Sequence, residues 1–129
     1  MNGVLLDSHT FLWLLQEPKK VGPHSKELIE TNATVFVSLA TIWELSLKYQ
    51  KQKLKFEPPR LLEAIQIMGA VLLPIQKEHI LTELALQLNH KDPFDKLLIA
   101  QAKYENLTLM TADRPILAMK LPFIANARQ

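Results

Sequence analysis

Short apolar runs and amphipathic segments alternate along the chain. The runs are bounded by polar or turn-forming residues, which is typical of strands buried on both faces of a parallel sheet. They lie at residues 4–6, 34–38, 71–75 and 107–110, with a short fifth strand expected near residues 123–124. Between them, apolar residues recur every three or four positions, which predicts helices. The first of these is expected to be capped by Ser8 and to end before Pro18, and the others lie at residues 25–30, 39–50, 61–68, 77–88 and from 93 onward.

This alternation indicates one α/β domain. Strands that are separated by helices pair as parallel βαβ units, so we expect a three-layer α/β/α sandwich with a mainly parallel central sheet. The chain has 129 residues, 48% of them hydrophobic, and no shift in composition divides it. We therefore expect a single domain over residues 1–129.

Composition limits the chemistry and the location of the protein. The chain contains no cysteine, which excludes disulfide scaffolds, thiolate metal sites and thiol nucleophiles. Its apolar runs are too short to span a bilayer, and no basic region precedes the hydrophobic segment near the N-terminus. We expect a soluble, cytoplasmic protein that does not bind a membrane. The net charge of +2 favours an anionic partner only weakly.

The stretch at residues 90–102, HKDPFDKLLIAQA, carries the strongest local signal. Asp92 followed by a proline is the pattern of a helix cap and a first helical position, which puts Asp95 in the first turn. On a helical wheel Asp95 shares a face with Ile99 and Ala102, so it heads an apolar stripe. A carboxylate in that setting needs a partner for its charge. We interpret Asp92 as the cap and leave open whether it also takes part in a site.

Three further acids stand where a parallel sheet could gather them. Asp7 and Asp113 follow the first and fourth strands, and Glu44 lies on the helix after the second strand. Ligands of such sheets bind outside the carboxyl ends of the strands. The architecture can therefore bring these acids together with Asp95. For Glu44 alone, the alternative is a surface ion pair with Lys48, four residues later.

Four carboxylates in one place would repel one another strongly. At separations of about 6 Å and an effective dielectric constant of about 20, the six pairs sum to about 16 kcal/mol, more than the stability of an ordinary domain. Some of the acids must then be protonated, or a cation must be bound. Oxygen ligands suit Mg²⁺ or Mn²⁺, and such a site can activate water against a phosphodiester.

The order and setting of these acids resembles the PIN domain and, more closely, the VapC-type toxins of bacterial toxin–antitoxin modules. The resemblance covers nearly the whole chain, and its most specific part is DPFDKLLIAQA. It is carried by Asp7 after an apolar strand, Glu44 in SLATIWELSLK, Asp95 in HKDPFDKLLIAQA, and Asp113 two residues after Thr111. It implies a metal-dependent endoribonuclease that hydrolyses RNA with Mg²⁺ or Mn²⁺, is neutralised by a cognate antitoxin and usually forms a homodimer.

The resemblance also implies roles for single residues. Asp7 and Asp95 are the best candidates for direct metal ligands, and the other two acids would complete the coordination directly or through water. Thr111 would orient a water or a ligand through its hydroxyl group, and Ser8 is a further candidate for the same role. The alternative for both hydroxyl residues is a simple place in a turn or a cap.

An acidic centre that acts on RNA needs basic flanks to hold the polyanion. The basic residues expected to bind RNA are Lys48, Lys51, Lys53, Lys55 and Arg114. Charge runs of this kind are more often solvated surface, so RNA binding by these side chains is a prediction that needs a direct test.

Two other functional classes remain open. The first is a non-catalytic module of PIN fold that binds RNA or protein, suggested by Phe11, Trp13 and Trp43 beside the basic loops, although such aromatics are more often core residues. The second is an aspartyl-phosphate enzyme, which needs a further carboxylate next to the aspartate after the first strand, where Ser8 and His9 stand instead. The sequence has no nucleotide-binding glycine motif and no serine-nucleophile elbow. The four histidines lack metal-ligand spacing, so we expect them to be surface, capping or partly buried polar residues.

Overall fold

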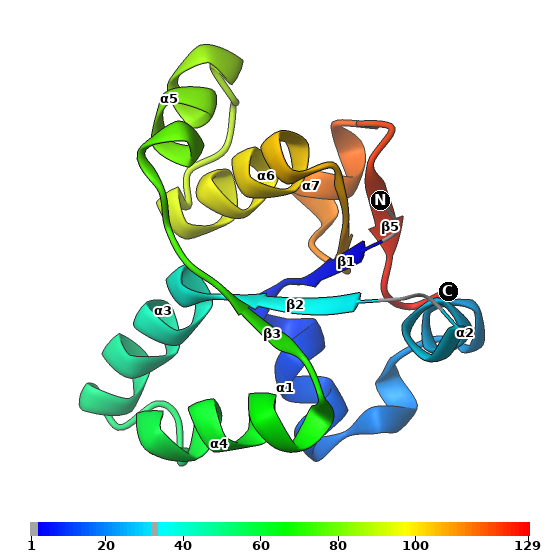
Figure 1. The fold of residues 1–129 in the computed structure, drawn as a ribbon, viewed down its shortest axis with the longest axis vertical. Helices are drawn as coiled ribbons and strands as arrows, with labels where there is room; N and C mark the ends of the chain where they lie inside the picture. Colours follow the sequence, from blue (N-terminus) through cyan, green and yellow to red (C-terminus); the bar gives the residue numbers. More distant parts are fainter. Residues whose placement is uncertain (1–2, 32–33) are drawn as a thin grey trace.

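Five parallel strands form the central sheet of the protein (Figure 1). The computed structural model describes residues 3–31 and 34–129. Each strand runs parallel to its neighbours, in the order β3-β2-β1-β4-β5. The strands are β1 Gly3–Leu6, β2 Thr34–Ser38, β3 Val71–Leu73, β4 Leu107–Thr111 and β5 Ile124–Asn126. The parallel sheet that the apolar runs predict is therefore confirmed.

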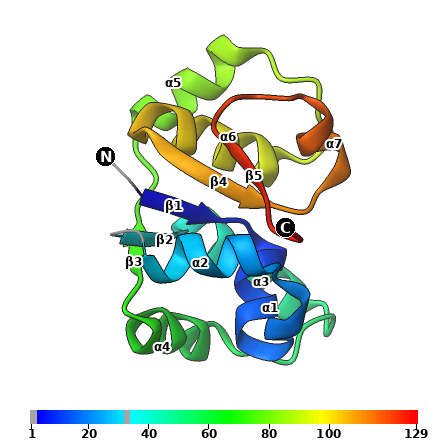
Figure 2. The ribbon, with the colours of Figure 1, turned by 90° about the vertical axis from the view of Figure 1, so that its right-hand side faces the viewer.

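Helices cover both faces of this sheet. Helices α1 to α4 lie on one face and α5 to α7 on the other, which gives the three layers expected from the sequence (Figure 1, Figure 2). The helices are α1 Ser8–Gln16, the 3-10 helix η1 Pro18–Lys20, α2 Pro23–Thr31, α3 Leu39–Gln50, α4 Pro58–Met68, α5 Lys77–Leu86, α6 Pro93–Glu105 and α7 Arg114–Ala118. Across residues 3–31 and 34–129, no helix is long and apolar enough to cross a membrane.

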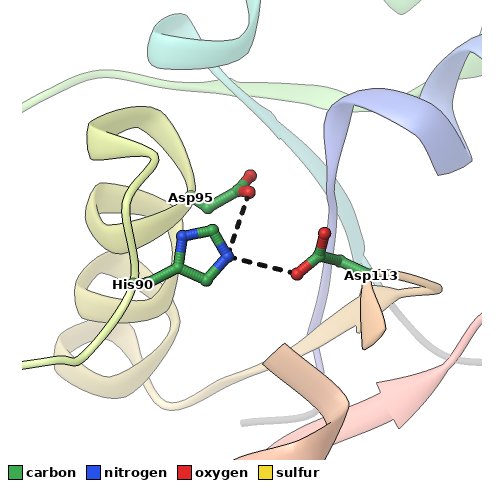
Figure 3. A group of neighbouring side chains, drawn as sticks. All are labelled: His90, Asp95 and Asp113. Atoms are coloured by element: carbon green, nitrogen blue, oxygen red, sulfur yellow. Dashed lines mark hydrogen bonds and ion pairs between the residues drawn. The ribbon is translucent and has the colours of Figure 1, made fainter. Parts of the chain in front are cut away.

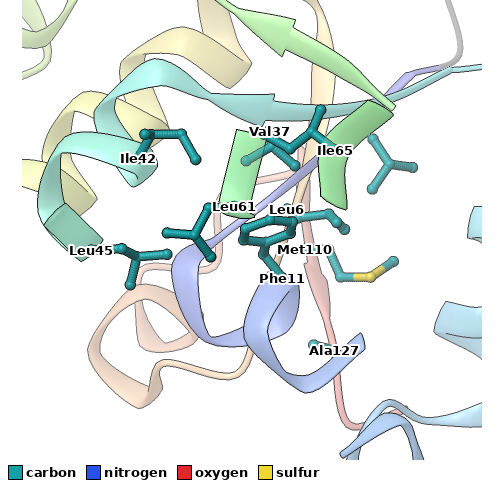
Figure 4. Packing of buried hydrophobic residues seen from close by; sticks show 10 residues of the cluster. Leu6, Phe11, Val37, Ile42, Leu45, Leu61, Ile65, Met110 and Ala127 are labelled. Atoms are coloured by element: carbon teal, nitrogen blue, oxygen red, sulfur yellow. The ribbon is translucent and has the colours of Figure 1, made fainter. Parts of the chain in front are cut away.

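Successive residues of each central strand enter different cores. Leu6 and Met110 pack with Phe11 under helices α1 to α4 (Figure 4). Leu5 and Leu109 pack on the opposite face, against α6. All five side chains are fully buried. Because both faces of the sheet are covered, β1 carries a continuous apolar run, Val4 to Leu6, and not an alternating pattern.

Some element boundaries differ from the expectation. The strand expected at residues 71–75 ends at Leu73, because Pro74 has no N–H to donate to the ladder. The helix expected at residues 61–68 begins already at Pro58, since proline suits the first helical turn. Helix α7 has only 5 residues, too few for a helical period to be visible in the sequence.

Two expectations about single residues are wrong. Asp7, and not Ser8, caps α1: its carboxylate accepts the N–H of Thr10 at 2.9 Å, and Ser8 is the first residue of the helix. Trp43 is not a core residue, because it is 58% exposed on α3 while Leu45 of the same helix is fully buried. The apolar stripe of α3 is therefore wider than the face that packs on the sheet.

A buried polar network fixes α6 against the other elements. Gln101 on α6 is fully buried, and its Oε1 accepts the hydroxyl of Ser38 at 2.6 Å. Its Nε2 lies 3.3 Å from the carbonyl oxygen of Pro74 and 3.3 Å from Nδ1 of His79. The His79 ring in turn lies 2.7 Å from the Glu105 carboxylate. These contacts join the end of β2 to α5 and α6, so they help to position the first turn of α6, which carries Asp95.

We expect Gln101→Leu to lower the free energy of unfolding by about 2 kcal/mol, measured by urea denaturation. Leucine is close to glutamine in volume, but it leaves the Ser38 hydroxyl and the Pro74 carbonyl without this partner. The matched control is Gln66→Leu at an exposed position of α4, where the change should stay within about 0.5 kcal/mol. Equal effects of the two substitutions would contradict the role of the network.

Candidate metal centre

Asp7 follows β1 directly and lies at the carboxyl edge of the sheet. Its Oδ1 accepts the N–H of Thr10 at 2.9 Å, and its Oδ2 accepts the hydroxyl of Thr111 at 2.5 Å. The residue is only 3% exposed. Burial raises the pKa of Asp7 above its ordinary value, and the hydrogen bonds from Thr111 and Thr10 lower that pKa only in part. Burial therefore disfavours the ionised form of the Asp7 carboxyl group.

Thr111, the last residue of β4, joins two of the acids. Its hydroxyl donates to Asp7 Oδ2 and accepts the backbone N–H of Asp113 at 3.0 Å. Asp113 caps α7, where its Oδ2 accepts the N–H of Ile116 at 3.0 Å. The Thr111 hydroxyl proton is thus engaged by a carboxylate, so this side chain orients protein groups of the centre.

The start of α6 brings the next two acids to the same edge. Asp92 caps the helix as predicted, and its Oδ1 accepts the N–H groups of Phe94 at 2.8 Å and Asp95 at 3.4 Å. The Asp95 carboxylate lies in the first turn, with Oδ2 3.5 Å from Nε2 of His90. The same Nε2 lies 3.2 Å from Oδ2 of Asp113 (Figure 3). His90 therefore stands between two carboxylates from different elements.

The environment of Asp95 disfavours its charged form. Burial raises the pKa of Asp95 to about 7, and the negative charges of Asp92, Asp113 and Glu44 act in the same direction, whereas His90 lowers this pKa. A carboxyl group with such neighbours is stabilised by either a proton or a nearby cation. A carboxyl group perturbed in this way by burial and by neighbouring charges marks a candidate functional site.

Glu44 on α3 approaches the centre from the side of β2. Its Oε1 accepts the hydroxyl of Ser8 at 2.6 Å, and its Oε2 lies 3.4 Å from Nζ of Lys48. The ion pair with Lys48 that the sequence allows is therefore present. It does not make Glu44 a surface residue, because the side chain is only 12% exposed.

Within the described residues, three possible ligands form the tightest group. The nearest ligand atoms of His90, Asp95 and Asp113 all lie within 4.8 Å of one another. Asp7 is outside this group and connects to Asp113 through the bridging threonine, while Glu44 is close enough to raise the pKa of Asp95. Carboxylate oxygens that are partly withdrawn from water fit a hard divalent cation such as Mg²⁺ or Mn²⁺.

Basic residues line clefts on the edge of this centre. A cleft of about 440 Å³ shares Glu44 and Asp92 with the acidic region, and its basic lining residues are Lys48, Lys51, Lys53 and Lys91. Lys55 is exposed but does not line it. Arg114 lines a second cleft, which shares Asp113 with the centre. The expected basic residues are thus divided between two clefts and the open surface.

Two residues of the site were not singled out by the sequence. His90 fits the general expectation of a partly buried polar residue, but its contact with Asp113 depends on a partner 23 residues away. Lys91 lies beside it in the loop before α6 and enters the basic cleft. The only local signal for either residue is its position next to the cap at Asp92, since a side chain just before a cap can fold back on the first turn.

The raised pKa of Asp95 predicts how stability depends on pH in the metal-free protein. Between its ordinary value of 3.8 and its folded value of about 7, the folded chain holds a proton that the unfolded chain releases. Stability in EDTA should therefore fall as the pH rises through this window. Asp95→Asn, which cannot ionise, should reduce that slope, and Asp7 should leave a residual slope of the same sign. Urea midpoints at about pH 4.5 and about pH 7.5 measure it, and equal slopes in the two proteins would contradict the assignment.

Comparisons with known proteins agree with the fold. A family model described as PIN domain matches residues 4–120. A toxin–antitoxin complex from Klebsiella pneumoniae contains a chain with a TM-score of 0.67 and 19% identity, over 96% of this chain and 97% of that one. VapBC2 from Rickettsia felis, bound to promoter DNA, gives a TM-score of 0.71 and 18% identity, over 96% and 98%.

FitAcB from Neisseria gonorrhoeae gives a TM-score of 0.65 and 18% identity, over 96% of this chain and 97% of that one. A comparison with curated proteins found no significant match. At these identities the solved structures establish the fold, while the family match spans most of the sequence. The chain belongs to the PIN domain family.

Proposed function

We propose that this PIN domain is a metal-dependent endoribonuclease and the toxin component of a toxin–antitoxin module. The observation that carries the proposal is the convergence of Asp95 and Asp113 on one point, with Asp7 and Glu44 beside them and a lysine-lined cleft adjoining. Its family and its structural likeness to chains of toxin–antitoxin complexes support a toxin nuclease. The proposal also places the protein in the cytoplasm, where it would meet its RNA substrate.

Asp95 and Asp113 would hold the cation, and Asp7 and Glu44 would complete the set of acids around it. When bound, Mg²⁺ or Mn²⁺ supplies positive charge that favours ionised water as a nucleophile and stabilises the phosphate in the transition state. The Thr111 hydroxyl donates a hydrogen bond to the Asp7 carboxylate and accepts one from the backbone N–H of Asp113. Its role in this proposal is to fix the distance between two acids.

The reaction is hydrolysis of a phosphodiester. The oxygen of one water forms a bond to phosphorus, one ester P–O bond breaks, and the leaving oxygen takes up a proton. The products are one phosphate end and one hydroxyl end. Asp7 is buried and the Asp95 side chain is only 18% exposed, so little water competes for these carboxylates, and their positions would determine where the cation stabilises charge.

The cleft beside Glu44 has the chemistry to hold the RNA on one side of the centre. Lys51, Lys53 and Lys91 are exposed and line it, and Phe94 gives it an apolar wall on which a base could pack. Phosphate contacts by lysines provide affinity without sequence preference, while aromatic side chains stack bases. Arg114, in the second cleft, would bind the strand beyond Asp113.

Two protein partners belong to this proposal. A cognate antitoxin is inferred from the toxin–antitoxin complexes that share the fold. A second copy of the chain is inferred from the family resemblance, and the surface proposed for it is an apolar groove of about 240 Å³ between α3, α5 and α6, lined by Trp43, Ile80 and Phe94 among others. Ile80 is 57% exposed, and large apolar side chains gathered at a surface often mark a protein interface.

The alternative function is a non-catalytic PIN module that binds RNA or protein. It would use the same lysine-lined cleft, and exposed Trp43 fits a binding surface. The aspartyl-phosphate alternative is less compatible with the geometry. Both oxygens of Asp7 accept hydrogen bonds and the residue is almost fully buried, so a phosphate donor could not reach it without rearrangement.

The proposal predicts that the purified, antitoxin-free protein cuts a transfer-RNA pool in Mg²⁺ or Mn²⁺ and not in EDTA. Asp95→Asn should lower the rate by at least about 100-fold, because it removes a charged ligand. The matched control is Asp92→Asn, which keeps a side chain able to cap α6 and should stay within about threefold of wild type. RNA binding in EDTA without cleavage in either metal would favour the non-catalytic module.

The lysine-lined cleft predicts the salt dependence of RNA binding. Replacing Lys51, Lys53 and Lys91 together with glutamine should weaken binding, because three phosphate contacts are lost. The slope of log affinity against log salt should fall by about 2, at roughly 0.7 for each contact with a single strand. Binding is measured in the Asp95→Asn background so that the RNA stays intact.

The control for this triple variant removes three lysines that do not line the cleft, by replacing Lys19, Lys26 and Lys77 with glutamine. Both triple variants change the net charge equally, so only a local contact can separate them. If the two triple variants had the same affinity and the same salt slope, the cleft would not be the RNA-binding surface.

The apolar groove predicts the oligomeric state. Ile80→Asp should convert a dimer into a monomer in light scattering of antitoxin-free protein, because it puts a charge into a surface that the second copy would cover. The control is Ile67→Asp on α4, at a side chain that is 78% exposed and does not line the groove. A dimer that survives Ile80→Asp would place the interface elsewhere.

A further inference from the structure

A single histidine lies between two carboxylates of the acidic centre. His90 Nε2 is 3.2 Å from Asp113 Oδ2 and 3.5 Å from Asp95 Oδ2 (Figure 3). The His90 side chain is only 8% exposed, whereas those of Asp95 and Asp113 are 18% and 32% exposed, so the imidazole side of these contacts is shielded from water. Two roles fit the position of Nε2. It could bind the cation itself, or it could donate a hydrogen bond to the carboxylates.

The other ring nitrogen distinguishes these two roles. Nδ1 of His90 accepts the backbone N–H of Asp92 at 3.0 Å. A backbone amide always donates, so Nδ1 must present its lone pair, and the proton of the neutral ring is then on Nε2. A ring nitrogen that carries a proton is a donor and has no lone pair for a cation. Coordination through Nε2 would require the proton to move to Nδ1 and the bond from Asp92 to break.

We propose that His90 is a positioning residue that holds the acidic centre by hydrogen-bond donation and does not bind the cation. Its Nε2–H donates to Asp113 Oδ2, beside Asp95 Oδ2, and so offsets the repulsion between the two carboxylates. The inference rests on the proposed function, because that function supplies the cation.

The connections of His90 explain why it can act in this way. Its Nδ1 is tied to the cap residue of α6, and its Nε2 is tied to the cap residue of α7. The ring therefore sets the distance between the first turns of two helices, each of which carries an acid of the centre. In the part of the chain that the structure describes, the hydrogen bonds to the Asp113 side chain from His90 and Ile116 both use Oδ2, which leaves Oδ1 for a cation.

The test is Mn²⁺ binding to the whole protein, measured by calorimetry for the wild type, His90→Leu and His90→Gln. Loss of a group that orients a metal ligand typically weakens metal binding 10–100-fold, so we expect Kd to rise about tenfold or more in His90→Leu. The amide Nε2 of glutamine can take the place of the imidazole Nε2 as donor, so His90→Gln should stay within about threefold of wild type. His24→Leu, at an exposed histidine on α2, should leave Kd unchanged.

Pulsed electron paramagnetic resonance of the Mn²⁺-loaded wild type provides the second readout. Direct coordination by imidazole produces a nitrogen-14 coupling to the manganese, and we expect none from His90. If the wild type shows no nitrogen coupling, the ligand question is answered without a variant, even if His90→Leu folds poorly.

Several results would overturn the role given to His90. They are a nitrogen coupling that disappears in His90→Leu, an unchanged Kd in folded His90→Leu, and a His90→Gln variant as weak as His90→Leu. A wild type that binds Mn²⁺ with any of these results refutes the positioning role alone. A wild type that binds no Mn²⁺ refutes the metal site as well, and with it the metal dependence of the proposed function.

Discussion

Repulsion between carboxylates that are withdrawn from water is the constraint on which this structure depends. At an effective dielectric constant of about 20, two such charges about 6 Å apart repel by about 3 kcal/mol. The protein offsets this repulsion with hydrogen-bond donors from separate elements. The Thr111 hydroxyl donates to Asp7 and the Ser8 hydroxyl donates to Glu44. Asp113 accepts hydrogen bonds from His90 and from the N–H of Ile116. Burial still raises the pKa of Asp95 to about 7. The repulsion between negative charges that these donors do not offset is the physical reason to expect a cation.

The parallel sheet explains why these groups meet. Leu6, the last residue of β1, is in register with Met110, the residue before the end of β4, and the N–H of Asp7 donates to the Met110 carbonyl at 3.1 Å. Helices α1, α6 and α7 then begin at this edge, each with an aspartate as its cap. The positive ends of helix dipoles stabilise nearby negative charge. The same feature that starts the helices therefore helps to hold the acids.

Local sequence signals predicted the elements better than they predicted the site. The strand at residues 34–38 and the helix at residues 39–50 have the expected bounds, because Ser38 ends one and caps the other. The cap at Asp92 was also predictable, because an aspartate followed by a proline is a local sequence pattern of a helix start. The role of His90 was not, because it arises from Asp113, which only the fold brings near. The ligand roles, the RNA and the partner proteins come from resemblance and stay proposals.

The central claim is that the acids of this edge form a site for a divalent cation. The most direct measurement is anomalous diffraction from crystals of the protein grown with Mn²⁺, recorded near the manganese absorption edge. The account predicts an anomalous peak bonded to carboxylate oxygens of Asp95 and Asp113 and not to Nε2 of His90. Crystals saturated with Mn²⁺ that show no peak between these two carboxylates, or a peak only at another surface, would contradict the account.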